Sequence, residues 1–491
     1  MDRTKYSRNN YIYLAIIIAI MTIIMYGLKD HISLDTFCII KYGYSKYASE
    51  IFLSAGRPLS AILLYIADFF SMKITTVVNI YLTLAIVISS ISVIVLKDKI
   101  KCILDSDNQK SEIILLMLSF TMIFNFMYLE YFLFIECPIM CLGTLLAIIV
   151  AYKLIIKASA KEFSQIIILG VLSIFCYQGT LNEIIIFCML FSIIHNKNGY
   201  KKIFIDIVKC AILSIILLLF NYIAIKISVG EVQGRLSTIG NIILNIEYII
   251  TNIPSILLNT LSLFPEKLFL LYVMLTIVVG YINCIKNKQV SDMLPIIIFS
   301  IFSIASAFIQ HIITLSSFGS GRLLFPIGMM IGGILTIAYI NFYRYNSKIL
   351  KLFYVSILIS YICALMFSYL NVIKAHNLTN KIDQNNIKLV NHWIKEYEFK
   401  NDKKVTKLGF LYDSTPNKTY ENVRSKSSFS NRALWANISI VGSINYYTGR
   451  NLIKVPVKLK IYNEYFKDKN WNKLSREQLV FIDDTLYFCV Y

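Results

Sequence analysis

The distribution of basic residues between long apolar stretches constrains this chain more than any other feature. Apolar stretches fill roughly the first 370 of its 491 residues, and many exceed the ~18 apolar residues that mark a membrane-spanning helix. The short loops between them alternate between loops that hold several Lys or Arg residues and loops that hold none. This alternation is the positive-inside pattern, and it predicts a polytopic helical membrane protein.

About eleven spans are expected from the apolar stretches. Basic clusters precede the first span and follow the second, fourth, sixth, eighth and tenth, whereas the loops 130–131, 178–179 and 315–321 have no Lys or Arg. The pattern therefore predicts a cytoplasmic N-terminus and an external C-terminus. The expected spans are roughly 11–28, 74–96, 112–129, 132–152, 163–177, 180–194, 203–227, 267–285, 293–314, 322–342 and 351–371.

Composition agrees with a membrane protein and argues against two other classes. Charged residues make up only 16% of the chain, whereas a soluble protein carries nearer a quarter. The net charge of +19 comes from short clusters between apolar stretches, so anionic lipid is the expected partner and nucleic acid is not. The ten cysteines have no metal-type spacing, and we interpret them as small apolar residues.

Two parts of the chain depart from the pattern of spans. The segments 58–72 and 240–264 are apolar but short or interrupted by polar residues, so we expect interfacial helices near 36–72 and 240–264. Beyond residue 371 the chain becomes polar and holds all three tryptophans. We therefore divide it into a transmembrane core, 1–371, and a small extracytoplasmic α/β domain, 372–491, with strands at 405–412 and 479–482 and an amphipathic helix at 387–399.

The first outer loop, 29–73, holds the candidate catalytic acids. Asp35 follows the first span and is suited to act as a general base for an acceptor hydroxyl. Asp30 and His31 compete with it for that role. A purely structural alternative is that Ser33 or Asp35 caps a helix that begins near Thr36.

Two arginines are candidates for binding a phosphate. Arg57 lies between Gly56 and Pro58, where a helix is expected to begin, and a guanidinium beside a helix N-terminus suits an anion. Arg322 follows Gly321 at the expected start of the tenth span, and Arg235 is a further candidate. The alternative for Arg57 is an interfacial side chain that extends its charge toward water.

Polar residues at membrane depth form the third group of candidates. Glu136 falls within an apolar run and is a further candidate acid, since carboxylates in such positions are costly and usually functional. Glu130, Tyr177, Gln178 and Glu183 would bind a sugar through hydrogen bonds and an aromatic face, or would act as interhelical contacts. The sequence has no Walker A, GxGxxG, HExxH or GxSxG motif.

Several of these motifs, in this order, resemble a known family. They are Ser33-Leu34-Asp35, Gly56-Arg57-Pro58-Leu59, Tyr177-Gln178 and Ser320-Gly321-Arg322 with Pro326. Together with the external C-terminal domain, they resemble the GT-C glycosyltransferases, and within these the Gtr-type glucosyltransferases of bacterial O-antigen. The resemblance covers most of residues 10–370.

The resemblance implies an inverting hexose transfer from a polyprenyl-phosphate donor to a cell-surface glycan such as lipopolysaccharide O-antigen. Asp35 would act as the base, and Arg57 and Arg322 would hold the departing lipid phosphate. No cofactor is assigned, and a divalent cation is left open. The enzyme would work on the outer face of the bacterial cytoplasmic membrane. An O-antigen polymerase and a polysaccharide flippase or transporter are the alternatives.

Overall fold

The protein is mostly helical (81%) in its computed structural model. Among the residues that the structure describes, six helices are long and apolar enough to cross a membrane, in agreement with the predicted class of helical membrane protein. The number of crossings and their direction stay predictions. The structure describes residues 3–104, 109–157, 160–196, 199–229, 239–287, 293–313, 321–342, 348–412, 433–434, 439–469, 471 and 473–490.

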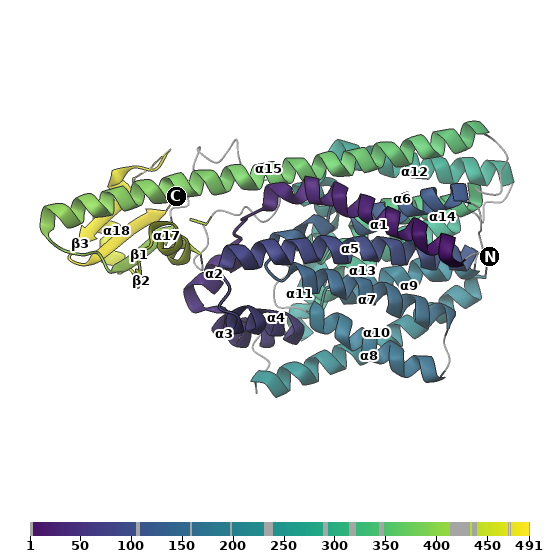
Figure 1. The fold of residues 1–491 in the computed structure, drawn as a ribbon, viewed down its shortest axis with the longest axis horizontal. Coiled ribbons are helices and arrows are strands. Elements are labelled where there is room, and N and C mark those ends of the chain that lie inside the picture. Colours follow the sequence, from purple (N-terminus) through teal and green to yellow (C-terminus); the bar gives the residue numbers. More distant parts are fainter. Residues whose placement is uncertain are drawn as a thin grey trace.

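A helix overlaps each of the eleven expected spans. The helices pack side by side in one elongated bundle (Figure 1). The six that satisfy the length and composition criterion are α1, α5, α7, α10, α13 and α15. The eleven helices are α1 (Arg3–Met25), α5 (Ile74–Leu104), α6 (Gln109–Ile123), α7 (Cys137–Ile156), α8 (Ala160–Cys176), α9 (Thr180–Asn196), α10 (Tyr200–Val229), α12 (Glu266–Asn287), α13 (Leu294–Ile313), α14 (Phe325–Phe342) and α15 (Lys348–Asn401).

Two lysines near the end of α5 are paired with residues of neighbouring helices. Lys97 is fully buried and donates to the Asn10 side chain at 2.5 Å. Lys101 pairs with Glu112 at 3.2 Å, which joins the end of α5 to the start of α6. The carboxylate and amide groups around these lysines compensate their positive charges, which burial removes from water.

Short helices occupy the segment 34–69, within which we expect interfacial helices. They are α2 (Leu34–Tyr42), α3 (Tyr44–Tyr47), a π-helical turn at Ala48–Leu53 and α4 (Pro58–Phe69). A further apolar helix, α11 (Ile239–Asn259), covers most of the second segment that we assigned to the interface. In Figure 1, α2, α3 and α4 lie at the end of the bundle opposite the N-terminus.

The fourth expected span, 132–152, begins later than predicted. A 3-10 turn occupies Tyr128–Leu133, and α7 begins at Cys137 with Pro138 in its first turn. Pro at this position favours a helix start because its fixed φ suits the first turn and its missing N–H is not needed there. Glu136 therefore lies at the N-terminus of a helix and not within a span.

The last helix continues across the compositional change at residue 371. α15 runs for 54 residues without Gly or Pro and extends well beyond the bundle (Figure 1). Its distal part, with Ile387, Val390 and Ile394, packs against a four-stranded sheet of order β2-β1-β4-β3. The strands are β1 (Lys407–Tyr412), β2 (Ile453–Lys454), β3 (Leu479–Ile482) and β4 (Thr485–Val490), and the accompanying helices are α17 (Ile440–Thr448) and α18 (Leu459–Tyr465).

The sheet of this C-terminal region is mixed. β1 pairs in parallel with both β2 and β4, and β3 pairs with β4 as an antiparallel hairpin. A parallel pair needs a crossover connection, and α17 and α18 lie in the stretches between β1 and β4. The region is thus a small α/β unit, and it lies beside the same end of the bundle as α2 and α3 (Figure 1).

Candidate functional site

The helix that carries Asp35 begins with a side-chain cap. Ser33 is the N-cap of α2, because its Oγ accepts a hydrogen bond from the Thr36 N–H at 3.3 Å. Of the two capping residues that the sequence offered, Ser33 is therefore the one used. Asp35 lies in the first turn of α2 and is not the residue that caps it.

Arg57 is held by three residues from distant parts of the chain. Its Nη1 forms an ion pair with Glu136 Oε1 at 3.4 Å, and its Nε donates to Gln178 Oε1 at 3.1 Å. Its guanidinium carbon lies 4.7 Å from the centroid of the Tyr177 ring, within cation–π range. Residues that we predict separately as a phosphate ligand, a catalytic acid and sugar contacts thus lie together at one place.

Gly56 allows the segment before α4 to approach Gln178 closely. Its φ of +70° is one that side chains rarely adopt, and a Cβ there would lie 2.9 Å from Gln178 Nε2. The same amide group donates to the Ala55 carbonyl, while the Gln178 carbonyl accepts from Gln310 Nε2. Gln178 therefore connects the segment before α4 to α13 and holds the backbone that precedes Arg57 in place.

Arg322 approaches the same tyrosine from another loop. Its guanidinium carbon lies 4.0 Å from the Phe134 ring centroid and 5.9 Å from that of Tyr177. Its backbone N–H donates to Glu130 Oε2 at 3.0 Å, and its carbonyl accepts from the Tyr131 hydroxyl at 3.3 Å. Two guanidiniums thus lie near one aromatic ring, although their residues are far apart in the sequence.

Glu183 lies behind these residues in a buried polar network. It accepts a hydrogen bond from the Tyr131 hydroxyl, and the Tyr131 ring packs edge to face with Tyr177 at 5.8 Å. The neighbouring Asn182 donates to the Leu323 carbonyl at 3.0 Å. Glu183 is fully buried, so this network is shielded from solvent. Its hydrogen bonds hold Tyr131 and the backbone next to Arg322 in place.

Asp35 and Glu136 bring negative charge to the same site. Asp35 is close enough to act electrostatically on both Glu136 and Arg322. Glu136 is 1% exposed, and its second oxygen, Oε2, has no hydrogen-bond partner among the described residues. A buried acceptor of this kind is costly to leave unmatched, and a ligand hydroxyl would satisfy it.

Two predicted site residues are not part of this cluster. Asp30 has a φ of +58° and pairs with the Asn79 side chain, which donates to it at 2.8 Å on an exposed surface. Arg235 lies outside the described residues. Within the described ranges, no group of three or more His, Cys, Asp or Glu residues is arranged to hold a metal ion.

The sequence prediction missed three residues of the site. Tyr131 lies in the expected loop 130–131 and Phe134 in the expected span 132–152, and their polar or cation-binding use depends on the 3-10 turn at Tyr128–Leu133. Gln310 lies in a long apolar stretch, and a single amide in such a stretch is a signal that could have identified it.

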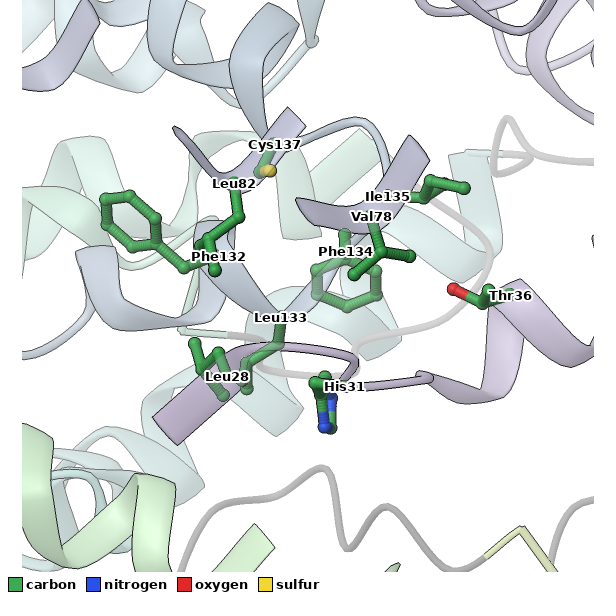
Figure 2. A pocket seen from close by; sticks show the side chains of 10 residues that line it. All are labelled: Leu28, His31, Thr36, Val78, Leu82, Phe132, Leu133, Phe134, Ile135 and Cys137. Carbon is green, nitrogen blue, oxygen red and sulfur yellow. The ribbon is translucent and has the colours of Figure 1, made fainter. Parts of the chain in front are cut away.

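A small recess adjoins this cluster (Figure 2). Most of its wall is apolar, and Thr36 and His31 are the polar residues in it. Phe134 contacts Arg322 and also lines the recess, so the two features share a wall. The lining residues are Leu28, His31, Thr36, Val78, Leu82, Phe132, Leu133, Phe134, Ile135 and Cys137.

Comparisons with known proteins give no relative for this chain. No model of a known protein family matches it, and no curated protein matches its sequence.

Proposed function

We propose that this protein is an inverting membrane glycosyltransferase that transfers a hexose, with glucose as the first candidate, from a polyprenyl-phosphate donor to a cell-surface glycan such as lipopolysaccharide O-antigen. The observation that carries the proposal is the placement of Arg57 and Arg322 around the Tyr177 ring, with Glu136 paired to Arg57 and the Asp35 carboxylate acting electrostatically on Glu136 and Arg322. This site adjoins an apolar bundle, where a lipid-linked donor is accessible.

In the proposed reaction, Asp35 removes the proton from an acceptor hydroxyl, and that oxygen attacks the anomeric carbon from the face opposite the phosphate. The bond between the anomeric carbon and the phosphate oxygen breaks, and its electron pair leaves with the lipid phosphate. Arg57 and Arg322 stabilise the negative charge that develops on this phosphate. Because phosphate is a good leaving group, the reaction does not depend on a strong general acid.

Two further residues of the site, Tyr177 and Glu136, are assigned to the sugar. Tyr177 presents an aromatic face, and Glu136 Oε2 is an unmatched acceptor for a hydroxyl. Gln178, Glu130 and Glu183 are assigned to orienting the backbone and side chains that surround it. The proposed location is the outer face of the bacterial cytoplasmic membrane, with the C-terminal region outside and turned toward the acceptor glycan.

The test uses purified full-length protein with a polyprenyl-phosphate glucose and isolated cell-surface polysaccharide. Release of polyprenyl phosphate and glucose incorporation are both measured. We expect Asp35→Asn to lower transfer by about 10²–10⁴-fold, as for loss of a general base. Asp30→Asn is the matched control, because Asp30 lies in the same loop but pairs with Asn79 away from the cluster. Parental transfer by Asp35→Asn, or no transfer by the parent protein, would overturn the proposal.

A further inference from the structure

Three consecutive residues of α2 face three different surroundings. Successive residues of an α-helix point about 100° apart around its axis. Asp35 acts on the charged cluster, Thr36 lines the recess shown in Figure 2, and Phe37 packs against the C-terminal region. Because the three residues are consecutive on one helix, the position of Asp35 depends on the packing around Phe37 and on the recess beside Thr36.

Phe37 is enclosed by residues that follow α15 in the sequence. It is 1% exposed and forms a small apolar core with Ile32 and Ala433. The rings of Tyr446 and Tyr447, on α17, pack edge to face against it at 6.2 and 5.7 Å between centroids. Edge-to-face aromatic contacts of this kind fix the orientation as well as the position of a ring.

The backbone of α17 also approaches the backbone of α2 closely. A Cβ on Gly442 would lie 3.1 Å from the Phe37 carbonyl carbon and closer still to its oxygen. The obstruction is backbone and not the end of a flexible side chain, so any larger residue at 442 would have to displace one helix from the other. The contact is thus possible only because residue 442 is glycine.

Thr36 lies on a different side of α2, beside a small recess with Phe132 and Leu133 across it (Figure 2). On the Phe37 side, α2 packs against Tyr446, Tyr447 and Gly442 of α17. The contact with α17 therefore holds this side of α2 in place.

We propose that Phe37 is a positioning residue, and that its contact with Gly442 and the α17 tyrosines sets the position of Asp35 for catalysis. The proposal rests on the proposed function, in which Asp35 is the base. It gives the C-terminal region a second role besides contact with the acceptor, because α17 of that region would hold Asp35 in its catalytic position.

Cys38, the next residue on α2, is a natural reporter of this contact. It is 4% exposed, and burial together with the nearby Asp35 carboxylate raises the pKa of its thiol to about 12, although Lys41 opposes this. Because the thiolate is the reactive form, a well-seated α2 should react slowly with a maleimide at neutral pH. Displacement of α2 toward solvent should lower this pKa and accelerate labelling.

The experiment compares Phe37→Ala, Phe37→Leu and Gly442→Ala in the full-length protein. Cys38 labelling is followed by peptide mass spectrometry, and kcat and donor KM are measured with polyprenyl-phosphate glucose. Gly409→Ala is the matched control, because its Cβ would contact the Tyr487 and Val457 side chains within the sheet and not α2.

We expect Phe37→Ala and Gly442→Ala to label Cys38 faster and to lower kcat by about 10²-fold, since misplacing a catalytic group by about 1 Å has this effect. Donor KM should change little, because the arginines are not on α2. Phe37→Leu should recover most of the activity, and Gly409→Ala should label as the parent does.

Parental Cys38 labelling and kcat in both Phe37→Ala and Gly442→Ala would overturn the positioning role. Accelerated labelling in Gly409→Ala to the same extent would also overturn it, because general loosening of the C-terminal region would then explain the effect. If Asp35→Asn retains transfer, the proposed function fails first, and that result is distinct from both of these.

Discussion

Arg57 forms an ion pair with Glu136 across 79 positions of sequence, with Nη1 and Oε1 3.4 Å apart. The pair is largely buried, and Glu136 has a second oxygen without a hydrogen-bond partner among the described residues. A phosphate that binds Arg57 must therefore share the guanidinium with a carboxylate that is already present. This relationship makes Glu136 the most informative acid to change after Asp35.

Replacement of Glu136 by Gln separates the two roles that an acid at this position can have. If Glu136 only balances the charge of Arg57, Glu136→Gln should bind the donor more tightly and keep turnover within about tenfold of the parent, a cost of about 1.4 kcal/mol. The amide keeps the shape and an acceptor for Arg57 but no longer competes with phosphate. Steady-state kcat and donor KM test this, and a loss of activity equal to that of Asp35→Asn would instead identify Glu136 as the base.

Lysine at either arginine position should give a partly defective enzyme. Lys keeps the positive charge but loses the planar fork that binds two phosphate oxygens at once. We expect Arg57→Lys and Arg322→Lys to raise donor KM by about tenfold, and the Ala variants by about 100-fold, since a hydrogen bond to a charged group contributes about 1.5–3 kcal/mol. Donor binding measured with a labelled polyprenyl-phosphate glucose provides the check. Parental binding by the Lys and Ala variants alike would show that these residues are interfacial anchors.

The Tyr177 ring is expected to matter more than its hydroxyl. Both guanidiniums lie within 6 Å of its centroid, at 4.7 and 5.9 Å. Tyr177→Leu should weaken donor binding by several-fold, since a cation–π contact contributes about 0.5–2 kcal/mol. Tyr177→Phe is the control that retains the ring, and equal defects in the two variants would contradict this assignment.

The predicted topology can be tested without any knowledge of the substrate. The charge pattern places the N-terminus in the cytoplasm and the C-terminal region outside. A reporter enzyme that is active only outside the cytoplasm, fused after Tyr491, should therefore be active, and the same reporter at the N-terminus should be inactive. Activity of only the N-terminal fusion would reverse the orientation and would place the candidate site on the cytoplasmic side.

Removal of the C-terminal region should separate donor binding from transfer. A protein that ends at Asn371 keeps the bundle, Arg57 and Arg322, but loses the partners of Phe37 and the contact between Asn380 and His31 at 3.0 Å. Donor binding should remain largely intact, whereas transfer to the acceptor should be lost or misdirected. Measurement of both in the same membranes makes the comparison direct. Transfer at the parental rate by the truncated protein would show that the region has another task.

The sequence identified most of the candidate site because its residues are polar interruptions in an apolar chain. Asp35, Arg57, Glu130, Glu136, Tyr177, Gln178, Glu183 and Arg322 stand out for this reason. A charged group next to a span is expensive unless it is compensated, so its presence alone is informative. Asp30 is also a charged residue next to a span, so the sequence alone does not distinguish it from the others. Only the structure shows that it pairs with Asn79, away from the cluster.

The sequence by itself determined the class of this protein. The length of its apolar stretches specifies membrane-spanning helices, and the basic residues in alternate loops distinguish one end of each helix from the other. Tertiary structure decided which polar groups meet. The ion pair of Arg57 with Glu136, and the contact of Phe37 with Gly442, join residues 79 positions or several hundred positions apart. Hydropathy and charge are local properties, whereas such contacts depend on how helices pack, and helix packing is set by side-chain shapes across the whole bundle.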